Sequence, residues 1–303
     1  MSEGGNSRLA RVRATAYPKL TLSLRVLGRR EDGFHDLDAL VVSLGQPHDV
    51  VEVFAVPAPG GVRVEVVGDD AAEGVPADHR NLAFVAAEKL LVRAGRSGHG
   101  VRLVLRKQVP AGAGLGGGSA DAAAALLAVR RLLDVDVDDA GVAALAAEIG
   151  ADVSFCLRGG AAWMRGRGEV IEPVPLQQGL AFVVAIPPFR LSTPEVYRMW
   201  DELGGPTATR TIPAPRRVAA FLPELANDLE PAAEALEPRL VEFRTALEVT
   251  TGRPALLAGS GSAYVVPVPD ARALPALTDD VRRRLRVPVV GTTSVSRGVR
   301  LAS

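Results

Sequence analysis

Cysteine, lysine and aromatic residues are scarce in this chain of 303 residues. It contains one cysteine and three lysines, and aromatic residues make up 4% of it. The single cysteine, Cys156, excludes a disulfide framework and a zinc site built from cysteines. Because Cys156 stands in the apolar stretch VSFCL, we expect a small buried side chain rather than a nucleophile.

The chain also has neither an excess of charge of one sign nor a long hydrophobic run. Lys+Arg and Asp+Glu both count 35, so the formal net charge is zero, which argues against nucleic acid or a membrane surface as partner. No apolar run reaches the length of a membrane span. The N-terminal stretch MSEGGNSRLARVRA has no apolar core of a signal peptide. These absences predict a cytoplasmic protein in a reducing setting.

Helical and strand patterns alternate irregularly along the chain, which predicts an α+β fold rather than repeated βαβ units. Leu20, Leu22, Leu24 and Val26 alternate as if on one face of a strand. A proline-rich change near 173–190 suggests the start of a second domain, and 204–215 is the most linker-like segment. The expected strands are 19–27, 37–44, 49–56, 61–68, 100–110, 180–186, 255–257, 263–268 and 287–292, and the expected helices are 80–95, 119–133, 138–150, 152–157, 194–203, 216–222, 238–251 and 270–285.

Glycine is concentrated in one stretch, PAGAGLGGGSADAAAAL, at residues 110–126. Five glycines stand between Gly112 and Gly118, after an expected strand and before an alanine-rich helix with Ser119 as its expected N-cap. Glycine lets backbone N–H groups approach an anion closely, and the helix N-terminus adds partial positive charge. The pattern favours a phosphate-binding loop over a flexible linker.

Two familiar phosphate loops fit this stretch less well. No Lys-Ser or Lys-Thr follows the glycines, which excludes a Walker A loop. Residues 112–117 satisfy G-x-G-x-x-G, but a dinucleotide site needs an acidic ribose ligand about 20 residues later. Asp138 and Asp139 stand there instead, and we expect one of them to cap a helix. From this loop alone, a dinucleotide-binding fold remains the alternative.

Several motifs, in order, resemble those of the GHMP kinases, small-molecule kinases that use ATP. The glycine stretch resembles the family's phosphate loop, AYPKLTLSL at 16–24 its N-terminal motif, and LLAGSGSAYVV at 256–266 its C-terminal glycine motif. Within the family, PKLTLSLRVLGRREDGFHDL, IGADVSFCLRGG, RGRGE, STPEVY and NDLE resemble the members that phosphorylate a cytidyl substrate. The resemblance covers about residues 14–265.

The resemblance implies a fold and a reaction. The fold is an α+β arrangement of two domains, residues 1–175 (ribosomal-protein-S5-domain-2-like) and 176–303 (ferredoxin-like), with the active site between them. The reaction is ATP-dependent phosphorylation of the 2-hydroxyl of 4-diphosphocytidyl-2-C-methyl-D-erythritol, a step of non-mevalonate isoprenoid synthesis. The partner is thus a small molecule, and the protein itself would be a monomer or a homodimer.

The resemblance also assigns roles to single residues. Lys19 and Asp152 would carry the chemistry. The acceptor would be contacted by Thr21, Phe34, His35 and Thr193, with Phe34 and His35 at cytosine. Asn81 would lie near the adenine, and the ATP phosphates would be held by Pro110, Ala111, Gly112, Ala113, Gly114, Leu115, Gly116, Gly117, Gly118, Ser119 and Ala120. Ser119 is also a candidate ligand for Mg²⁺.

Each of these residues has a plainer local interpretation. Asp152 follows Gly150 and could cap the next helix, and Asn81 could do the same for its own helix. Lys19 could be an exposed lysine at a strand edge, and His35 an ordinary turn residue. Their joint occurrence with the glycine loop favours the functional roles.

The sequence leaves the acceptor open. Thr21 stands where the family usually has asparagine, and Trp163 stands where a small residue is usual. A related kinase with another small alcohol as acceptor is therefore one alternative. A nucleotide-binding protein without catalysis is another, although the presence of both Lys19 and Asp152 weighs against it.

Overall fold

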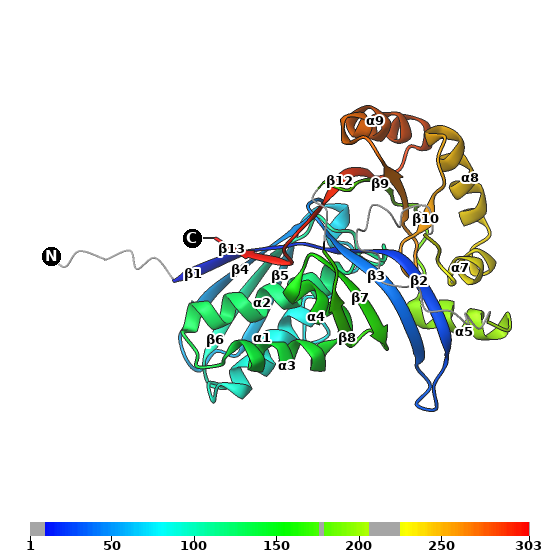
Figure 1. Cartoon of the computed structure of the whole chain (residues 1–303). Helices are drawn as coiled ribbons and strands as arrows, with labels where there is room; N and C mark the ends of the chain where they lie inside the picture. Colours follow the sequence, from blue (N-terminus) through cyan, green and yellow to red (C-terminus); the bar gives the residue numbers. More distant parts are fainter. Residues whose placement is uncertain (1–9, 176–178, 206–224, 303) are drawn as a thin grey trace.

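The chain folds into two β-sheets and a set of helices, as Figure 1 shows. The structure is a computed structural model that describes residues 10–175, 179–205 and 225–302. Within these ranges the strands are β1 (Arg11–Ala16), β2 (Lys19–Arg29), β3 (His35–Leu44), β4 (Asp49–Val56), β5 (Val62–Val67), β6 (Gly100–Arg106), β7 (Ala161–Gly166), β8 (Val170–Pro173), β9 (Ala181–Ala185), β10 (Leu256–Leu257), β11 (Tyr264–Val268), β12 (Val289–Val295) and β13 (Val299–Leu301). The α-helices are α1 (Leu82–Arg93), α2 (Gly117–Leu133), α3 (Asp139–Ile149), α4 (Ala151–Arg158), α5 (Thr193–Glu202), α7 (Glu230–Leu236), α8 (Arg239–Thr251) and α9 (Leu274–Leu285). The predicted α+β class is confirmed.

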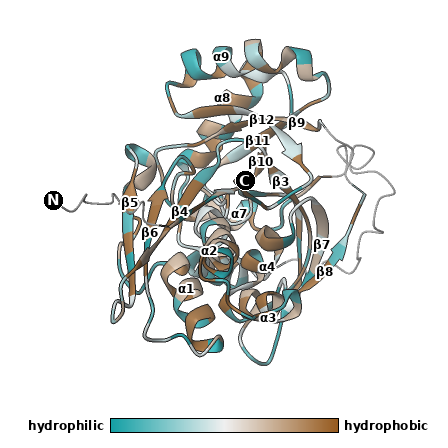
Figure 2. Cartoon of the chain, turned by 90° about the vertical axis from the view of Figure 1, so that its left-hand side faces the viewer, coloured by the Kyte–Doolittle hydropathy of each residue, from teal (hydrophilic) through white to brown (hydrophobic). Residues whose placement is uncertain are grey.

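One sheet has five strands in the order β13-β1-β4-β6-β5. Helix α2 packs on β1 and β4, and α1 packs on α2 and β5, so that both helices cover the same face. Figure 2 shows α1 to α4 gathered on that side of the sheet. The alanines of α2 explain the close packing: from Ala120 to Ala128 nearly every side chain is buried. This packing places the N-terminus of α2, and the glycine loop before it, at the centre of the molecule.

The second sheet has the strand order β10-β11-β9-β12-β3-β7-β8, with β2 paired to β3. Strands from both halves of the sequence meet where β12 pairs with β3, at Ser294 opposite Leu44. Helix α9 packs on β9 and β12, and α8 packs on α9. After β12 the chain returns to the first sheet, where β13 pairs with β1. The predicted division at residue 175 stays a prediction, and the last strand lies with the first half.

A β-bulge in β2 alters the predicted strand pattern. The pairing with β3 shifts between Thr21 and Ser23, which leaves Leu22 without a partner residue. Leu20 and Leu22 therefore belong to one hydrophobic cluster and Leu24 to another, so that the expected single face is wrong. Side chains alternate between the two faces of a sheet only while the pleat is unbroken. A bulge moves the residues after it to the opposite face. The bulge lies beside the residues that line the central cavity.

The remaining element predictions fall into three groups. Most expected helices and strands are present within a few residues of their predicted ends. Strands β1, β7, β8 and β13 and helix α7 were not expected; none of them is longer than seven residues, and short elements carry little periodic signal. The expected helix 216–222 and most of the expected loop 204–215 lie outside the described residues.

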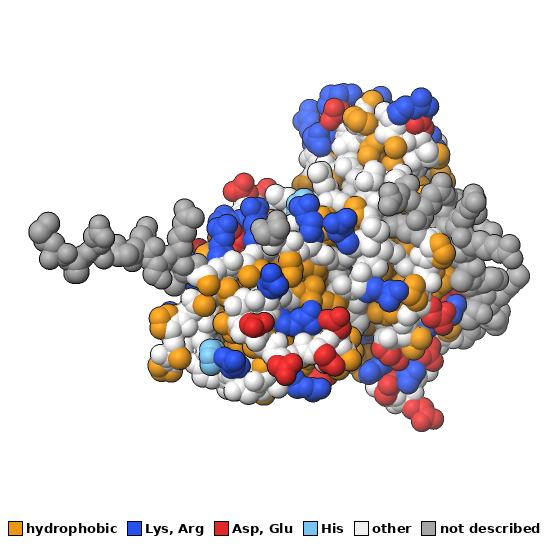
Figure 3. Space-filling view, turned by 60° about the vertical axis from the view of Figure 1, so that its left-hand side comes forward, with side chains coloured by type: hydrophobic (Ala, Val, Ile, Leu, Met, Phe, Trp, Pro, Cys, Tyr) orange, Lys and Arg blue, Asp and Glu red, His pale blue; other side chains and the backbone are white. Residues whose placement is uncertain are grey.

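The face of the molecule seen in Figure 3 carries Lys and Arg side chains interspersed with Asp and Glu. This mixture agrees with the zero net charge of the chain. No helix among the described residues is long and apolar enough to cross a membrane.

Candidate active site

A cavity of roughly 1350 Å³ lies between the glycine loop, the β2–β3 hairpin and α5. Nearly all residues that the sequence assigned to a site line it: Lys19, Thr21, Phe34, His35, Asn81, Pro110, Ala111, Gly112, Ala113, Gly114, Leu115, Gly116, Gly117, Gly118, Ser119, Asp152 and Thr193. Ala120 is the exception. It is fully buried, its N–H donates to the carbonyl of Gly116, and it does not line the cavity. Ala120 therefore lies behind the wall of the cavity, and its contact with the ATP phosphates stays a prediction that this position does not favour.

The glycine loop needs glycine at three positions. Gly112, Gly114 and Gly116 have φ angles of 73°, 77° and 67°, in the left-handed region that side chains disfavour. A Cβ on Gly114 would lie 2.2 Å from the carbonyl oxygen of Ala258. The loop thus packs directly on the C-terminal glycine motif, and motifs far apart in sequence form one wall of the cavity.

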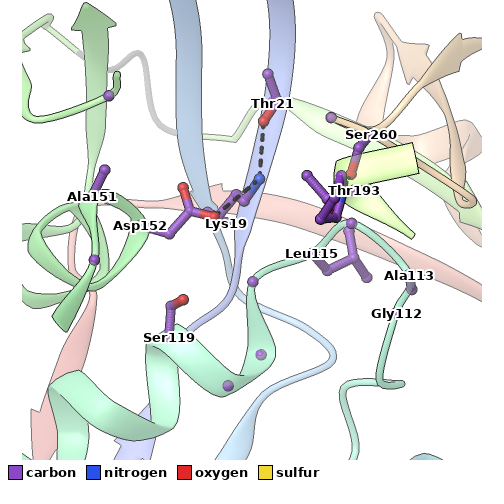
Figure 4. Close-up of a pocket in the computed structure, with 18 of the residues that line it drawn as sticks. Lys19, Thr21, Gly112, Ala113, Leu115, Ser119, Ala151, Asp152, Thr193 and Ser260 are labelled. Atoms are coloured by element: carbon purple, nitrogen blue, oxygen red, sulfur yellow. Dashed lines mark hydrogen bonds and ion pairs between the residues drawn. The ribbon is translucent and has the colours of Figure 1, made fainter. Parts of the chain in front are cut away.

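Helix α2 starts earlier than predicted, and this changes the role of Ser119. The N-cap is Gly116, without a side-chain cap, and Ser119 is the third helical residue. The predicted N-cap at Ser119 is wrong, because the left-handed Gly116 already ends the loop. Figure 4 shows the Ser119 side chain directed toward the space below Lys19 and Asp152. Its half-buried hydroxyl makes no hydrogen bond within the described residues and can serve a ligand.

Lys19 and Asp152 lie next to each other in the wall of the cavity. The Nζ atom of Lys19 lies 3.5 Å from Oδ2 of Asp152 and donates a hydrogen bond of 3.2 Å to Oγ1 of Thr21 (Figure 4). Lys19 is only 8% exposed, so it is not the exposed edge lysine of the plainer interpretation. Its backbone N–H donates to the carbonyl of Leu115, which ties β2 to the glycine loop. The ammonium group is thus held between the carboxylate of Asp152 and the hydroxyl of Thr21.

Asp152 is not a helix cap. The N-cap of α4 is Gly150, without a side-chain cap, and Asp152 is the second helical residue. Its side chain is 42% exposed and points toward Lys19 (Figure 4). A carboxylate is favoured in the first turn of a helix because the macrodipole is positive there. The cap interpretation is therefore wrong, and Asp152 instead directs Oδ2 at the cationic side chain of Lys19.

His35 is fixed by helix α5. Its Nε2 lies 2.8 Å from Oδ1 of Asp201, and its ring stacks on Tyr197 at 4.8 Å between centroids. Trp200 meets the same ring edge-on at 5.4 Å. Burial and the charge of Asp152 raise the pKa of Tyr197, so its hydroxyl stays protonated. His35 is therefore more than a turn residue, since three side chains of another element orient its ring.

Phe34 is exposed at the mouth of the cavity. Its side chain is 56% exposed, and the guanidinium of Arg167 lies 4.8 Å from its ring centroid. Thr193, the first residue of α5, shares a hydrogen bond of 2.7 Å with Ser260. An exposed aromatic face and a pair of hydroxyl groups suit a flat, polar ligand.

Asn81 and Trp163 serve the fold in ways that the sequence left open. Asn81 caps α1: its Oδ1 accepts from the N–H of Ala83, and its Nδ2 donates to the carbonyl of Pro76. Asn81 also lines the cavity, so its place near adenine stays a prediction.

Trp163 is fully buried in β7, and its neighbour Met164 lines the cavity instead. The unusual tryptophan thus does not line the cavity.

Several cavity residues were not assigned from the sequence. Tyr197, Asp201, Arg167 and Ser260 all line the cavity. Tyr197 and Ser260 lie inside the quoted motifs STPEVY and LLAGSGSAYVV, so motif membership is the signal that could have found them. Arg167 lies inside the quoted motif RGRGE, so the same signal applies to it. Asp201 lies outside every quoted motif, and only the fold brings it beside His35.

Three charged side chains form the floor beneath the glycine loop. Lys107 donates to Oδ2 of Asp121 at 2.5 Å and also to Asp49. Burial raises the pKa of Asp121 to about 7, although the charge of Lys107 acts in the opposite direction. No local pattern in the sequence predicts the burial of Lys107. Within the described ranges, no group of three or more His, Cys, Asp or Glu side chains is arranged to hold a metal ion.

Known proteins share this architecture and sequence. Residues 81–160 match the family model "GHMP kinases N terminal domain". The 4-diphosphocytidyl-2-C-methyl-D-erythritol kinase of Moorella thermoacetica is 38% identical over 82% of this chain and 87% of its own length. That of Cutibacterium acnes is 36% identical over 92% of each chain.

Solved structures agree. A crystal structure of a 4-(cytidine 5'-diphospho)-2C-methyl-D-erythritol kinase superposes with a TM-score of 0.77, at 34% identity, over 93% of this chain and 98% of that one. Homoserine kinase from Cytophaga hutchinsonii, at 18% identity and a TM-score of 0.72, shares the fold. With relatives above 30% identity matched over most of their length, the chain belongs to the 4-diphosphocytidyl-2-C-methyl-D-erythritol kinase family of the GHMP kinases, which are ATP-dependent.

Proposed function

We propose that this chain transfers the γ-phosphoryl group of ATP to the 2-hydroxyl of 4-diphosphocytidyl-2-C-methyl-D-erythritol. The observation that carries the proposal is the separation of 3.5 Å between Lys19 Nζ and Asp152 Oδ2, beside a glycine loop at a helix N-terminus. The names of the relatives supply the acceptor. The geometry supplies a cation, a carboxylate and an anion cradle in one cavity.

Phosphoryl transfer depends on alignment and on compensation of charge more than on covalent chemistry. The first N–H groups of α2 have no partner within the helix and are available to phosphate oxygens. Lys19 would attract the γ-phosphate and offset its repulsion from Asp152. The acceptor oxygen attacks the γ-phosphorus, the bond to the β–γ bridging oxygen breaks, and ADP leaves. Asp152 accepts the hydroxyl proton or orients the hydroxyl for attack.

Mg²⁺ belongs to the proposal as a companion of ATP. The Ser119 hydroxyl makes no hydrogen bond to the part of the chain that the structure describes. It lies in the first turn of α2, is directed at the cavity and fits a hard cation that prefers oxygen ligands (Figure 4). The ion would neutralise charge on the β- and γ-phosphates when bound. Ser119 would hold it through its hydroxyl, with phosphate oxygens and water completing the coordination.

The acceptor's cytosine would lie at the end of the cavity formed by Phe34, His35 and Tyr197. Two aromatic rings there offer faces for stacking, and His35 offers a ring edge for hydrogen bonds. Thr21, bound to Lys19, and Thr193 would contact the polar middle of the acceptor. This end of the cavity distinguishes a cytidyl substrate from a small alcohol without a base.

An ADP-release assay over a panel of acceptors tests the proposal. We expect turnover with 4-diphosphocytidyl-2-C-methyl-D-erythritol and at most traces with homoserine or mevalonate, and mass spectrometry should show one added phosphoryl group. Turnover with another alcohol only would identify a kinase of different specificity. ATP binding without ADP release from any acceptor would identify a non-catalytic nucleotide-binding protein.

A further inference from the structure

Beneath the glycine loop, one buried cation joins two buried carboxylates. Lys107 is 6% exposed, Asp49 is fully buried and Asp121 is 1% exposed. The Nζ atom of Lys107 donates to Asp121 Oδ2 at 2.5 Å and to Asp49 Oδ2. The three residues come from the segment after β6, the start of β4 and the second turn of α2. None of them has a role in the phosphoryl transfer described above.

Asp49 holds the chain where the glycine loop begins. Its Oδ1 accepts hydrogen bonds from the N–H groups of Gln108 at 2.6 Å and Val109 at 2.9 Å. Both residues directly precede Pro110, the first residue of the loop. A carboxylate that accepts two backbone N–H groups fixes the direction in which the loop leaves the strand.

Asp121 holds the other end, where the loop has become helix α2. The two ends are also in contact: a Cβ on Gly117 would lie 2.9 Å from Val109 Cγ1 and 3.5 Å from Asp49 Oδ2. Lys107 therefore bridges a carboxylate at the entrance of the loop and a carboxylate at its exit. The distance between the two ends of the loop determines how closely its backbone N–H groups can surround one phosphate.

The bridge depends on the charge of Lys107. Without the ammonium group, two desolvated carboxylates would face each other, and a buried charge without its partner is strongly unfavourable. The repulsion is relieved if the two carboxylates move apart, or if Asp121 takes up a proton, because burial already raises the pKa of its carboxyl. In either case the link between Asp49, at the entrance of the loop, and Asp121, beyond its exit, is lost.

We propose that Lys107 is a positioning residue for ATP, which sets the width of the phosphate loop by joining Asp49 to Asp121. The proposal rests on the proposed function only in that the loop binds ATP phosphates. The identity of the acceptor does not enter it. A simple core role for the three residues is the competing interpretation, and it predicts lower stability without a specific loss of phosphate binding.

The test is the affinity for β,γ-imido-ATP, measured by calorimetry on the full chain. Lys107→Met should weaken binding at least tenfold at a temperature well below its melting point. Binding of adenosine, which has no phosphate, should change less than threefold. Lys89→Met is the matched control: Lys89 forms an exposed ion pair with Glu148 at 2.8 Å, away from the loop, and its loss should leave the affinity unchanged. Affinity of a folded Lys107→Met variant within twofold of the parent chain overturns the proposal, and so does an equal loss for adenosine.

A second variant, Asp121→Asn, tests the proposal if Lys107→Met does not fold. Asp121→Asn keeps the shape of the side chain and leaves Lys107 paired with Asp49, so the fold should survive. We expect affinity for β,γ-imido-ATP to fall at least threefold, with the adenosine affinity retained; an unchanged affinity overturns the proposal. A parent chain that binds the analogue but phosphorylates no cytidyl acceptor would contradict the proposed function and leave this test intact. A parent chain that does not bind the analogue contradicts both.

Discussion

Gly116 lies against the side chain of Lys19: a Cβ on Gly116 would be 2.8 Å from Cγ of Lys19. Gly116, which ends the phosphate loop, therefore also limits the positions that the ammonium group of Lys19 can take in the cavity. Gly116 has a φ of 67°, so a side chain there is strained as well as crowded. One position thus couples the shape of the loop to the placement of Lys19.

Replacement of Gly116 by valine should weaken ATP binding at least tenfold, because it displaces both the loop and Lys19. Calorimetric titration with ATP measures this. Gly252→Val is a matched control: Gly252 has a φ of 64°, and a Cβ there would meet nothing within 4 Å. Both variants should lose about 1–2 kcal/mol of stability from the left-handed backbone, but only the Gly116 variant should lose ATP affinity. Normal ATP affinity in a folded Gly116→Val variant would remove the loop from the site.

Loss of the His35 ring should affect the acceptor and spare ATP. We expect His35→Ala to raise KM for the cytidyl acceptor about tenfold or more, since one lost hydrogen bond to a buried partner is worth about 1–3 kcal/mol. The KM for ATP should stay within twofold. His99→Ala, at an exposed turn where His99 contacts Arg96, should change neither constant. If His35→Ala raises both KM values equally, the ring supports the fold of the hairpin instead.

Asn227 should stabilise the C-terminal glycine motif. Its Nδ2 donates to the carbonyls of Leu257 and Gly259 at 2.9 and 2.6 Å, and its Oδ1 accepts from the N–H of Leu229. Asn227→Ala should lower the free energy of unfolding by about 1–3 kcal/mol, because it leaves these buried groups without a partner. Urea denaturation measures the loss. A change below about 0.5 kcal/mol, the usual range for surface substitutions, would show that water or a local shift replaces the side chain.

Cys156 should be inert in the folded protein. It is fully buried on α4, and burial raises the pKa of its thiol, with the charge of Asp152 acting in the same direction. The thiolate that reacts with disulfide reagents is therefore scarce at neutral pH. A colorimetric thiol reagent should label no cysteine in the native state and one after unfolding in denaturant. Rapid labelling of the native protein would show that α4 opens readily.

The resemblance to the GHMP kinases predicted part of the cavity lining but not the local geometry. The pattern of glycines before a helix predicted the phosphate loop, and the resemblance of the ordered motifs implied Lys19 and Asp152. The structure brings all three to one cavity. Local rules failed at Ser119, where a left-handed glycine took over the capping position. They also failed in β2, where a β-bulge changes which side of the sheet the later side chains face. No residue type at this position predicts the bulge.

Long-range contacts account for the rest. Asp201 orients His35, and Arg167, which lies in the motif RGRGE, covers Phe34, but no pattern along the chain predicts either contact. The Lys107 bridge joins three segments that only the five-stranded sheet and α2 bring together. Single-sequence patterns describe one element at a time, so such contacts between elements lie beyond them.

Lys19 and Asp152 should act as one unit in the transfer step. Lys19→Met should lower kcat, because it removes the cation that the γ-phosphate and the carboxylate share. Its effect should not add to that of Asp152→Asn in the double variant. Fully additive losses in kcat would mean that the two side chains serve separate steps.

The turnover of Asp152→Asn tests the central claim most directly. Asparagine keeps the shape of the side chain and removes its charge and its proton acceptor, and Asp152 caps no helix. We predict that kcat with 4-diphosphocytidyl-2-C-methyl-D-erythritol falls about 10²- to 10⁴-fold. Stability should fall by only about 0.3–1 kcal/mol, the contribution of a charge in the first turn of a helix. A folded variant with the kcat of the parent chain would contradict the assignment of Asp152, and with it the account of this cavity as the site of phosphoryl transfer.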